Sequence, residues 1–172
     1  MNEKALKTLE YNKIIAQLAE YACCDEAKEH ALSLRPICDK AEIERLQLET
    51  KDALNRLFKG GRLSFSGVRD INGSLKRLDI GGSLNTIELL SICSLLEAAK
   101  RAKAFSRSEK DEETTDSLTE RFAQIEPLTP LCDEIRRCIL SEEEIADDAS
   151  SALRSIRRSM RSMNDRIRAQ MN

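Results

Sequence analysis

A row of arginines near the end of the chain offers the clearest ligand-binding chemistry in this sequence. Guanidinium groups that recur at one-turn and two-turn spacing along a helix can reach successive phosphates without reading bases. The ordinary charged surface of a coiled coil would show the same residues, and the sequence leaves both interpretations open. The candidate nucleic-acid contacts are Arg154, Arg157, Arg158, Arg161 and Arg168.

An acidic run lies directly before these arginines. Residues 142–148 have neither a histidine partner nor the ligand order of an EF-hand loop, so they do not predict a metal site. We interpret the run as a solvated turn, with a short extended piece around Ile145, whose negative charge favours the N-terminus of the next helix. The net charge of the whole chain is only −2, so phosphate binding would have to be local to the arginine row.

The sequence contains few residues that could form a catalytic site. His30 is the only histidine, and it lies on a predicted surface helix without a nucleophile motif beside it. The pairs Gly60-Gly61 and Gly81-Gly82 follow predicted helices, whereas a phosphate-binding loop follows a strand and carries a lysine after its glycines. We therefore expect no catalytic or cofactor-binding residue here, and no enzyme activity from this chain alone.

The six cysteines predict neither a metal site nor disulfides. None of them is spaced as C-x-x-C, and one histidine cannot complete a Cys/His zinc set. The first ten residues are polar, and no stretch approaches the roughly 18 apolar residues of a membrane span. We therefore expect a cytoplasmic chain without a membrane segment, in which reduced thiols are small core or surface residues.

The composition predicts an all-α fold around these residues. Charged residues make up 34% of the chain and aromatic residues 3%, and there are only three prolines. Asp39 followed by Glu42 resembles a capping box, and the pair Gly60-Gly61 should end the helix that begins there. Ser83 or Asn85 is expected to cap the clearest helix of the chain, in which good helix formers continue to Lys103.

The arginine row belongs to a final helix with a heptad pattern. Residues 150–172 contain neither glycine nor proline, and the apolar residues alternate at spacings of three and four, so they form an a/d seam with most arginines facing away from it. Because the seam has no partner helix after it, we expect the chain to be a piece of a longer protein. The seam residues are Leu153, Ile156, Met160, Met163 and Ile167.

Four segments follow from this pattern. Residues 1–105 are expected to form a helical core, and the polar residues 106–117 a flexible connector. Residues 118–149 continue the helical part and include the acidic turn. Residues 150–172 form the arm that carries the seam and the arginines.

Several short motifs, spread over the whole chain in one register, are shared with a known family. Residues 7–15 and 17–22 match its opening, and Leu34-Arg35-Pro36 fits its L-x-P break. On these motifs the chain resembles the MutS-II family, bacterial paralogues of the mismatch-repair protein MutS. The other matching residues are Gly67-Val68-Arg69-Asp70-Ile71, Leu75-Lys76-Arg77, Gly81-Gly82 with Leu84, and Asp147-Asp148-Ala149-Ser150 with Leu153 and Ile156-Arg157-Arg158.

The resemblance implies a multi-helix lever or core bundle of MutS type, with residues 150–172 as the first strand of its clamp coiled coil. The whole protein of the family would add an ATPase domain that binds ATP and Mg²⁺ and forms a homodimer, and an Smr-type endonuclease domain. Its partners would be branched DNA, in recombination control and DNA repair, or collided ribosomes, in ribosome quality control. This chain would couple the nucleotide state of the ATPase to the clamp.

A second interpretation needs no such parent protein. The chain could be a self-contained helical adaptor that recruits a partner helix through its a/d seam.

Overall fold

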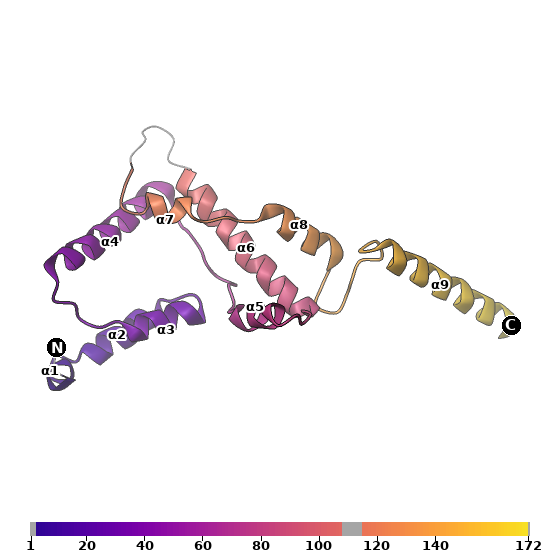
Figure 1. Cartoon of the computed structure of the whole chain (residues 1–172), viewed down its shortest axis with the longest axis horizontal. Helices are drawn as coiled ribbons and strands as arrows, with labels where there is room; N and C mark the ends of the chain where they lie inside the picture. Colours follow the sequence, from indigo (N-terminus) through magenta and orange to yellow (C-terminus); the bar gives the residue numbers. More distant parts are fainter. Residues whose placement is uncertain (1–2, 108–114, 172) are drawn as a thin grey trace.

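The computed structural model describes residues 3–107 and 115–171, and over these residues the fold is all-α, as predicted, with helices joined by loops. The helices form an elongated array rather than one compact bundle (Figure 1). None of them combines the length and the hydropathy needed to cross a lipid bilayer. The nine helices of the described residues are α1 (Glu3–Thr8), α2 (Tyr11–Glu20), α3 (Asp25–Ser33), α4 (Lys40–Gly60), α5 (Asn72–Asp79), α6 (Thr86–Arg107), α7 (Thr119–Ala123), α8 (Thr129–Cys138) and α9 (Ser151–Met171).

Two of the predicted helix caps are present. The Asp39 carboxylate accepts a hydrogen bond from the Glu42 backbone N–H at 3.0 Å, although the Glu42 carboxylate binds Arg45 and does not complete the box. At α6 the box is reciprocal: Asn85 Oδ1 accepts from Glu88 N and Glu88 Oε2 accepts from Asn85 N, both at 2.9 Å. Asn85, rather than Ser83, is therefore the cap of α6.

The glycine pair at the end of α4 has two separate functions. Gly61 has a φ of 83°, the left-handed conformation that ends a helix and that other residues rarely adopt. At Gly60 the small residue is favoured by packing instead, because a Cβ there would lie 2.9 Å from the ring of Phe105 on α6. The pair lets α4 stop while its end lies against α6.

The main core lies between α6 and α8. The two helices run antiparallel, because the Thr86 hydroxyl at the start of α6 donates to the Glu142 carbonyl after α8, while Lys103 near the other end donates to the Phe122 carbonyl in α7. Aliphatic side chains and two thiols fill the contact. The buried cluster consists of Cys93, Leu96, Cys132, Ile135 and Ile139.

Outside this core, little of the chain's surface is buried. Its accessible surface is 13574 Å², whereas a compact 19.4 kDa protein would expose about 8,500 Å². The helix pairs α2–α3 and α1–α2 pack beside each other at one end of the array, and α9 extends at the other (Figure 1). Most of the predicted connector, residues 108–114, lies outside the described residues.

The buried thiols of the core give a testable expectation. Cys93 Sγ lies 2.8 Å from Cys132 Sγ, and burial, with the Cys132 hydrogen bond, raises the pKa of Cys93 to about 12. At neutral pH, a thiol-alkylating reagent should therefore label the exposed Cys23 and Cys38 at least tenfold faster than Cys93, as followed by peptide mass spectrometry. Denaturant should abolish the difference. Equal labelling rates in the native chain would show that this core does not form.

Candidate nucleic-acid interface

The arginine row lies on α9, which projects from the end of the molecule (Figure 1). Ser150 caps this helix, because its Oγ accepts a hydrogen bond from the Leu153 backbone N–H at 3.1 Å. None of the described residues of α9 is buried. The helix therefore offers nearly its whole surface to a partner.

The predicted seam is exposed along one face of α9. Ile156, Met160, Met163 and Ile167 each expose between 54% and 64% of their surface, and Leu153 is half-buried. Within the described residues no helix covers this face. Pairing of the seam in a coiled coil therefore stays a prediction.

The base of α9 is anchored to the core through the acidic turn. Ile139, just after α8, forms an isolated antiparallel bridge with Ile145, which confirms the short extended piece predicted there. The Ala146 backbone N–H donates to the Cys138 carbonyl at 2.8 Å, and the Arg137 guanidinium donates to the Asp148 carbonyl at 2.9 Å. These bonds fix the direction in which α9 leaves the α6–α8 core.

Asp147, in this turn, binds two of the predicted arginines at once. Its Oδ1 accepts from Arg157 and its Oδ2 from Arg161, each at 2.5 Å. Because residues 157 and 161 are one turn apart, both guanidinium groups reach the same carboxylate. The hydrogen bonds from Arg157 and then Arg161 lower the pKa of Asp147 below its ordinary value. Arg157 also donates to the Ile145 carbonyl at 2.7 Å.

The other arginines of the row differ in their surroundings. Arg154 lies 3.6 Å from the Asp148 carboxylate. Arg158 and Arg168 are exposed, and the described part of the chain provides neither with an ion-pair partner. The structure therefore divides the row into three arginines that face the acidic turn and two whose charge is open to solvent.

The acidic run is thus not only the solvated turn that the sequence suggested. Asp147 and Asp148 are partners of the arginines, so acid and base form one unit at the base of α9. A signal for this was present, because Arg157 and Arg161 fall one turn apart within reach of a preceding acidic residue. The chain reversal at residues 139–146 could not be read from periodicity, however, and it is this reversal that sets the carboxylate beside the helix.

A second polar cluster, which the sequence analysis missed, joins α4 to α7. Arg56 of α4 is 5% exposed and forms a two-point ion pair with Asp116, with bonds of 2.6 and 2.7 Å. Its guanidinium carbon lies 5.0 Å from the centre of the Phe122 ring. On the same face of α4, the Asp52 carboxylate accepts from the Ser117 hydroxyl at 2.6 Å. This cluster fixes the residues that follow the undescribed segment onto α4.

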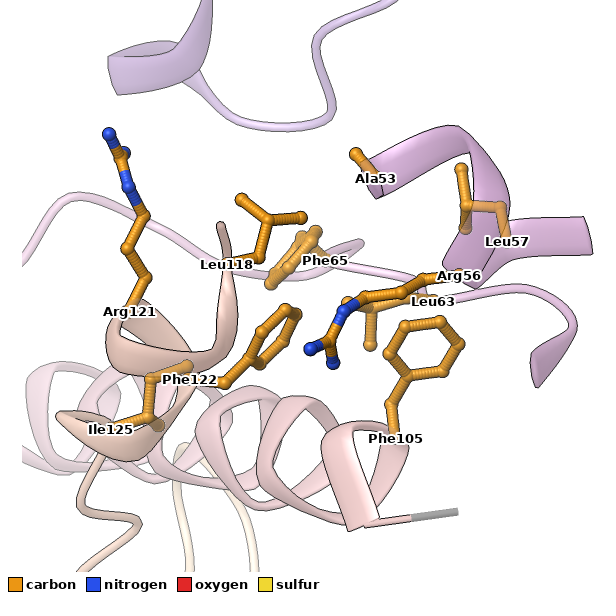
Figure 2. A pocket seen from close by; sticks show the side chains of 10 residues that line it. All are labelled: Ala53, Arg56, Leu57, Leu63, Phe65, Phe105, Leu118, Arg121, Phe122 and Ile125. Carbon is orange, nitrogen blue, oxygen red and sulfur yellow. The ribbon is translucent and has the colours of Figure 1, made fainter. Parts of the chain in front are cut away.

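An apolar pocket of about 390 Å³ lies beside this cluster (Figure 2). Arg56 reaches into it from α4, between Phe122 of α7 and Phe105 of α6. The rings of Phe105 and Phe122 are 6.3 Å apart. The pocket has no paired nucleophile and base among its lining residues, so its chemistry is that of a packing contact rather than a catalytic centre.

Among the residues that the structure describes, one cluster has the residue types of a metal site. Cys93, Glu97 and Cys132 bring three ligand atoms within 4.8 Å of one another between α6 and α8, although the cysteine spacing did not reveal it. The Arg136 guanidinium already binds Glu97 Oε1 at 2.9 Å, and burial raises the pKa of the Cys93 thiol. A cation would have to displace the arginine and deprotonate a buried thiol, so these residues fit a metal poorly.

Comparison with known proteins finds relatives that match nearly all of this chain. No family model matches the chain. It is 63% identical over 171 residues to a protein named endonuclease MutS2 of Agathobacter rectalis, which covers 99% of this chain and 22% of the relative. It is 51% identical to the endonuclease MutS2 of Lachnoclostridium phytofermentans, over 97% of this chain and 22% of the relative. It is 45% identical to the endonuclease MutS2 of Lachnospira eligens, over 100% of this chain and 21% of the relative.

The chain therefore spans about a fifth of the length of these relatives. The match to the Lachnospira eligens relative covers the whole chain, including the core of α6 and α8 and the arginine row of α9. As its motifs predicted, the chain belongs to the MutS2 family, the bacterial MutS paralogues also called MutS-II.

Proposed function

We propose that this chain is the lever and clamp-proximal part of a MutS2 protein, and that α9 contacts the phosphate backbone of DNA. The observation that carries the proposal is the pair Arg158 and Arg168, exposed on a projecting helix and without an ion-pair partner among the described residues. They are ten residues apart, which is about 15 Å along a helix. A duplex presents one phosphate charge per about 1.7 Å of axis, so both can reach phosphate at once.

The names of the relatives support the same partner class. An endonuclease acts within a nucleic-acid strand, and the relatives that this chain matches carry that name. The chain itself would have no nuclease or ATPase activity. ATP with Mg²⁺, homodimerisation and the Smr-type nuclease belong to the proposal for the whole protein, as do the recombination and ribosome functions that the resemblance implies.

The lever function has a structural basis in the anchoring of α9. The bridge at Ile139 and Ile145 and the bond from Arg137 to the Asp148 carbonyl link α9 to the end of α8. α8 in turn packs on α6 through the main buried cluster. A rigid-body rotation of α6 and α8, caused by a distant nucleotide site, would therefore swing α9 with them.

Removing the two open arginines tests the proposal. We expect Arg158→Gln/Arg168→Gln to weaken binding of the 172-residue chain to a fluorescent DNA duplex and to flatten log K against log salt by about 1.8, or 0.9 per lost phosphate contact. The matched control is Arg62→Gln/Arg69→Gln, which removes two exposed arginines from the loop between α4 and α5. Fluorescence anisotropy at several salt concentrations measures both variants.

Three outcomes of this titration decide the matter. Equal loss in the two double variants would mean non-specific charge, and the proposal would be wrong. Tighter, arginine-dependent binding to duplex RNA than to DNA would replace DNA with RNA as the partner. A four-way junction bound more tightly than a duplex would support branched DNA.

The exposed seam supports a second candidate, the helical adaptor. Met160→Gln/Met163→Gln should leave DNA binding unchanged if α9 binds phosphate through its arginine face. The same variant should lose any partner helix that docks by knobs-into-holes packing. Pull-down with a complementary a/d peptide and DNA anisotropy therefore separate the two functions.

A further inference from the structure

The contact of Asp147 with two arginines has the geometry of an occupied anion site. Two guanidinium groups from successive turns of α9 converge on the two oxygens of one carboxylate. A carboxylate and a phosphate both offer paired oxygens that guanidinium groups bind, so either anion can fill such a site. In this chain the Asp147 carboxylate itself occupies the site.

The internal contact is open to competition. The Arg161 side chain is 71% exposed, that of Asp147 42% and that of Arg157 34%. Ion pairs between groups this exposed are weak, because water and salt screen them. A phosphate, which carries more acceptor oxygens, can therefore take over the two arginines without unfolding any helix.

The position of the site favours backbone phosphate as the competing anion. Arg161 lies on the same side of α9 as Arg158 and Arg168, because steps of three and seven residues return close to the same face of a helix. Arg157 is one turn before Arg161. A duplex bound along the open arginines would pass directly beside the site that Asp147 fills.

We infer that Asp147 is an internal competitor of DNA, which holds Arg157 and Arg161 in place and limits how tightly α9 binds backbone phosphate. This inference rests on the proposed function, since it requires that α9 binds DNA at all. In the free chain Asp147 keeps two guanidinium groups extended on the helix surface. While the carboxylate occupies them, Arg157 and Arg161 contribute little to the attraction between α9 and backbone phosphate.

Replacing Asp147 with asparagine tests the inference. Asp147→Asn should bind a DNA duplex more tightly than the wild type at low salt and should show a steeper salt dependence. Each arginine that becomes available adds about 0.9 to the slope, so a fourfold rise in salt should weaken binding about 3.5-fold more per arginine. The matched control is Glu143→Gln, which removes one negative charge from the same turn but has no ion pair among the described residues.

The arginine background separates competition from general charge. When it is combined with Arg157→Gln/Arg161→Gln, Asp147→Asn should raise DNA affinity no more than Glu143→Gln does, because the groups that it releases are gone. A gain in that background equal to the gain in the wild type would overturn the inference. Far-UV circular dichroism should show unchanged helix content in each variant, since all three residues lie on the surface.

Failure of the inference and failure of the proposed function give different results. If the wild type binds DNA through Arg158 and Arg168 but Asp147→Asn behaves like Glu143→Gln, the inference alone is wrong. If neither the wild type nor Asp147→Asn binds duplex or junction DNA at low salt, the proposed function is wrong and the inference falls with it.

Discussion

Arg56→Met should lower the free energy of unfolding by about 3 kcal/mol, because it leaves the Asp116 carboxylate without its buried partner. Arg56 is 5% exposed and binds both oxygens of Asp116. Methionine can fill part of the space beside Phe122, but it cannot donate to a carboxylate. Urea unfolding at neutral pH, followed by circular dichroism, measures the loss.

The control variants isolate the charge. Arg101→Gln removes an exposed arginine from α6 and should change stability by less than about 0.5 kcal/mol. The double variant Arg56→Met/Asp116→Leu should recover much of the loss, since an apolar pair often replaces a buried ion pair at little cost. A double variant no more stable than Arg56→Met would show that packing, rather than the unpaired carboxylate, causes the effect.

The same pair predicts a pH dependence. The Arg56 hydrogen bonds hold the pKa of Asp116 at about 2, below its ordinary 3.8. Because the folded pKa is depressed, the pair stabilises the fold fully above about pH 4, and this contribution of about 2 kcal/mol is lost as pH falls toward 2. The stability difference between wild type and Arg56→Met should therefore shrink over this window in urea titrations. A difference that stays constant from pH 7 to pH 2 would contradict the pairing.

Ile135→Ala should destabilise the chain by about 2–5 kcal/mol, the second large effect. Ile135 is 7% exposed and lies in the buried cluster that joins α8 to α6. Removing three carbons from this narrow core leaves a cavity, and no other layer of the elongated array can compensate for it. The midpoint of urea unfolding measures the change.

Leu131→Ala is the matched control for this prediction. Leu131 lies on the same helix but is 48% exposed, so its truncation removes much less buried apolar surface. It should cost under about 1 kcal/mol, helped by the higher helix propensity of alanine. Equal costs at positions 131 and 135 would mean that α8 does not pack on α6 through the face described.

Much of the local structure follows from the sequence. The caps at Asp39 and Asn85 and the stop at Gly60-Gly61 are chosen by bonds within a few residues, so short patterns predict them. The all-α fold follows from the composition, which is rich in charged residues and poor in aromatic residues and proline. The start of α9 after Ser150 also agrees with its pattern. The family, too, was evident from short motifs and is confirmed by the relatives.

The contacts between distant residues could not be read in this way. Arg56 and Asp116 are 60 residues apart, and a stretch that the sequence marks as polar connector ends in the partner of a buried arginine. Cys93 and Cys132 meet across 39 residues without any metal-site spacing. Side-chain type predicts that a buried charge needs a partner, but it does not say which partner the chain brings near.

For the candidate site, the sequence alone determined that α9 is a helix with an apolar seam on one face and arginines on another, because helical periodicity fixes which residues share a face. Only the tertiary structure decided which arginines are available. The reversal after α8 brings Asp147 against Arg157 and Arg161, whereas Arg158 and Arg168 stay open to solvent. The physical reason is that electrostatic pairing depends on distance in space, and a turn of a few residues sets that distance without leaving a periodic trace in the sequence.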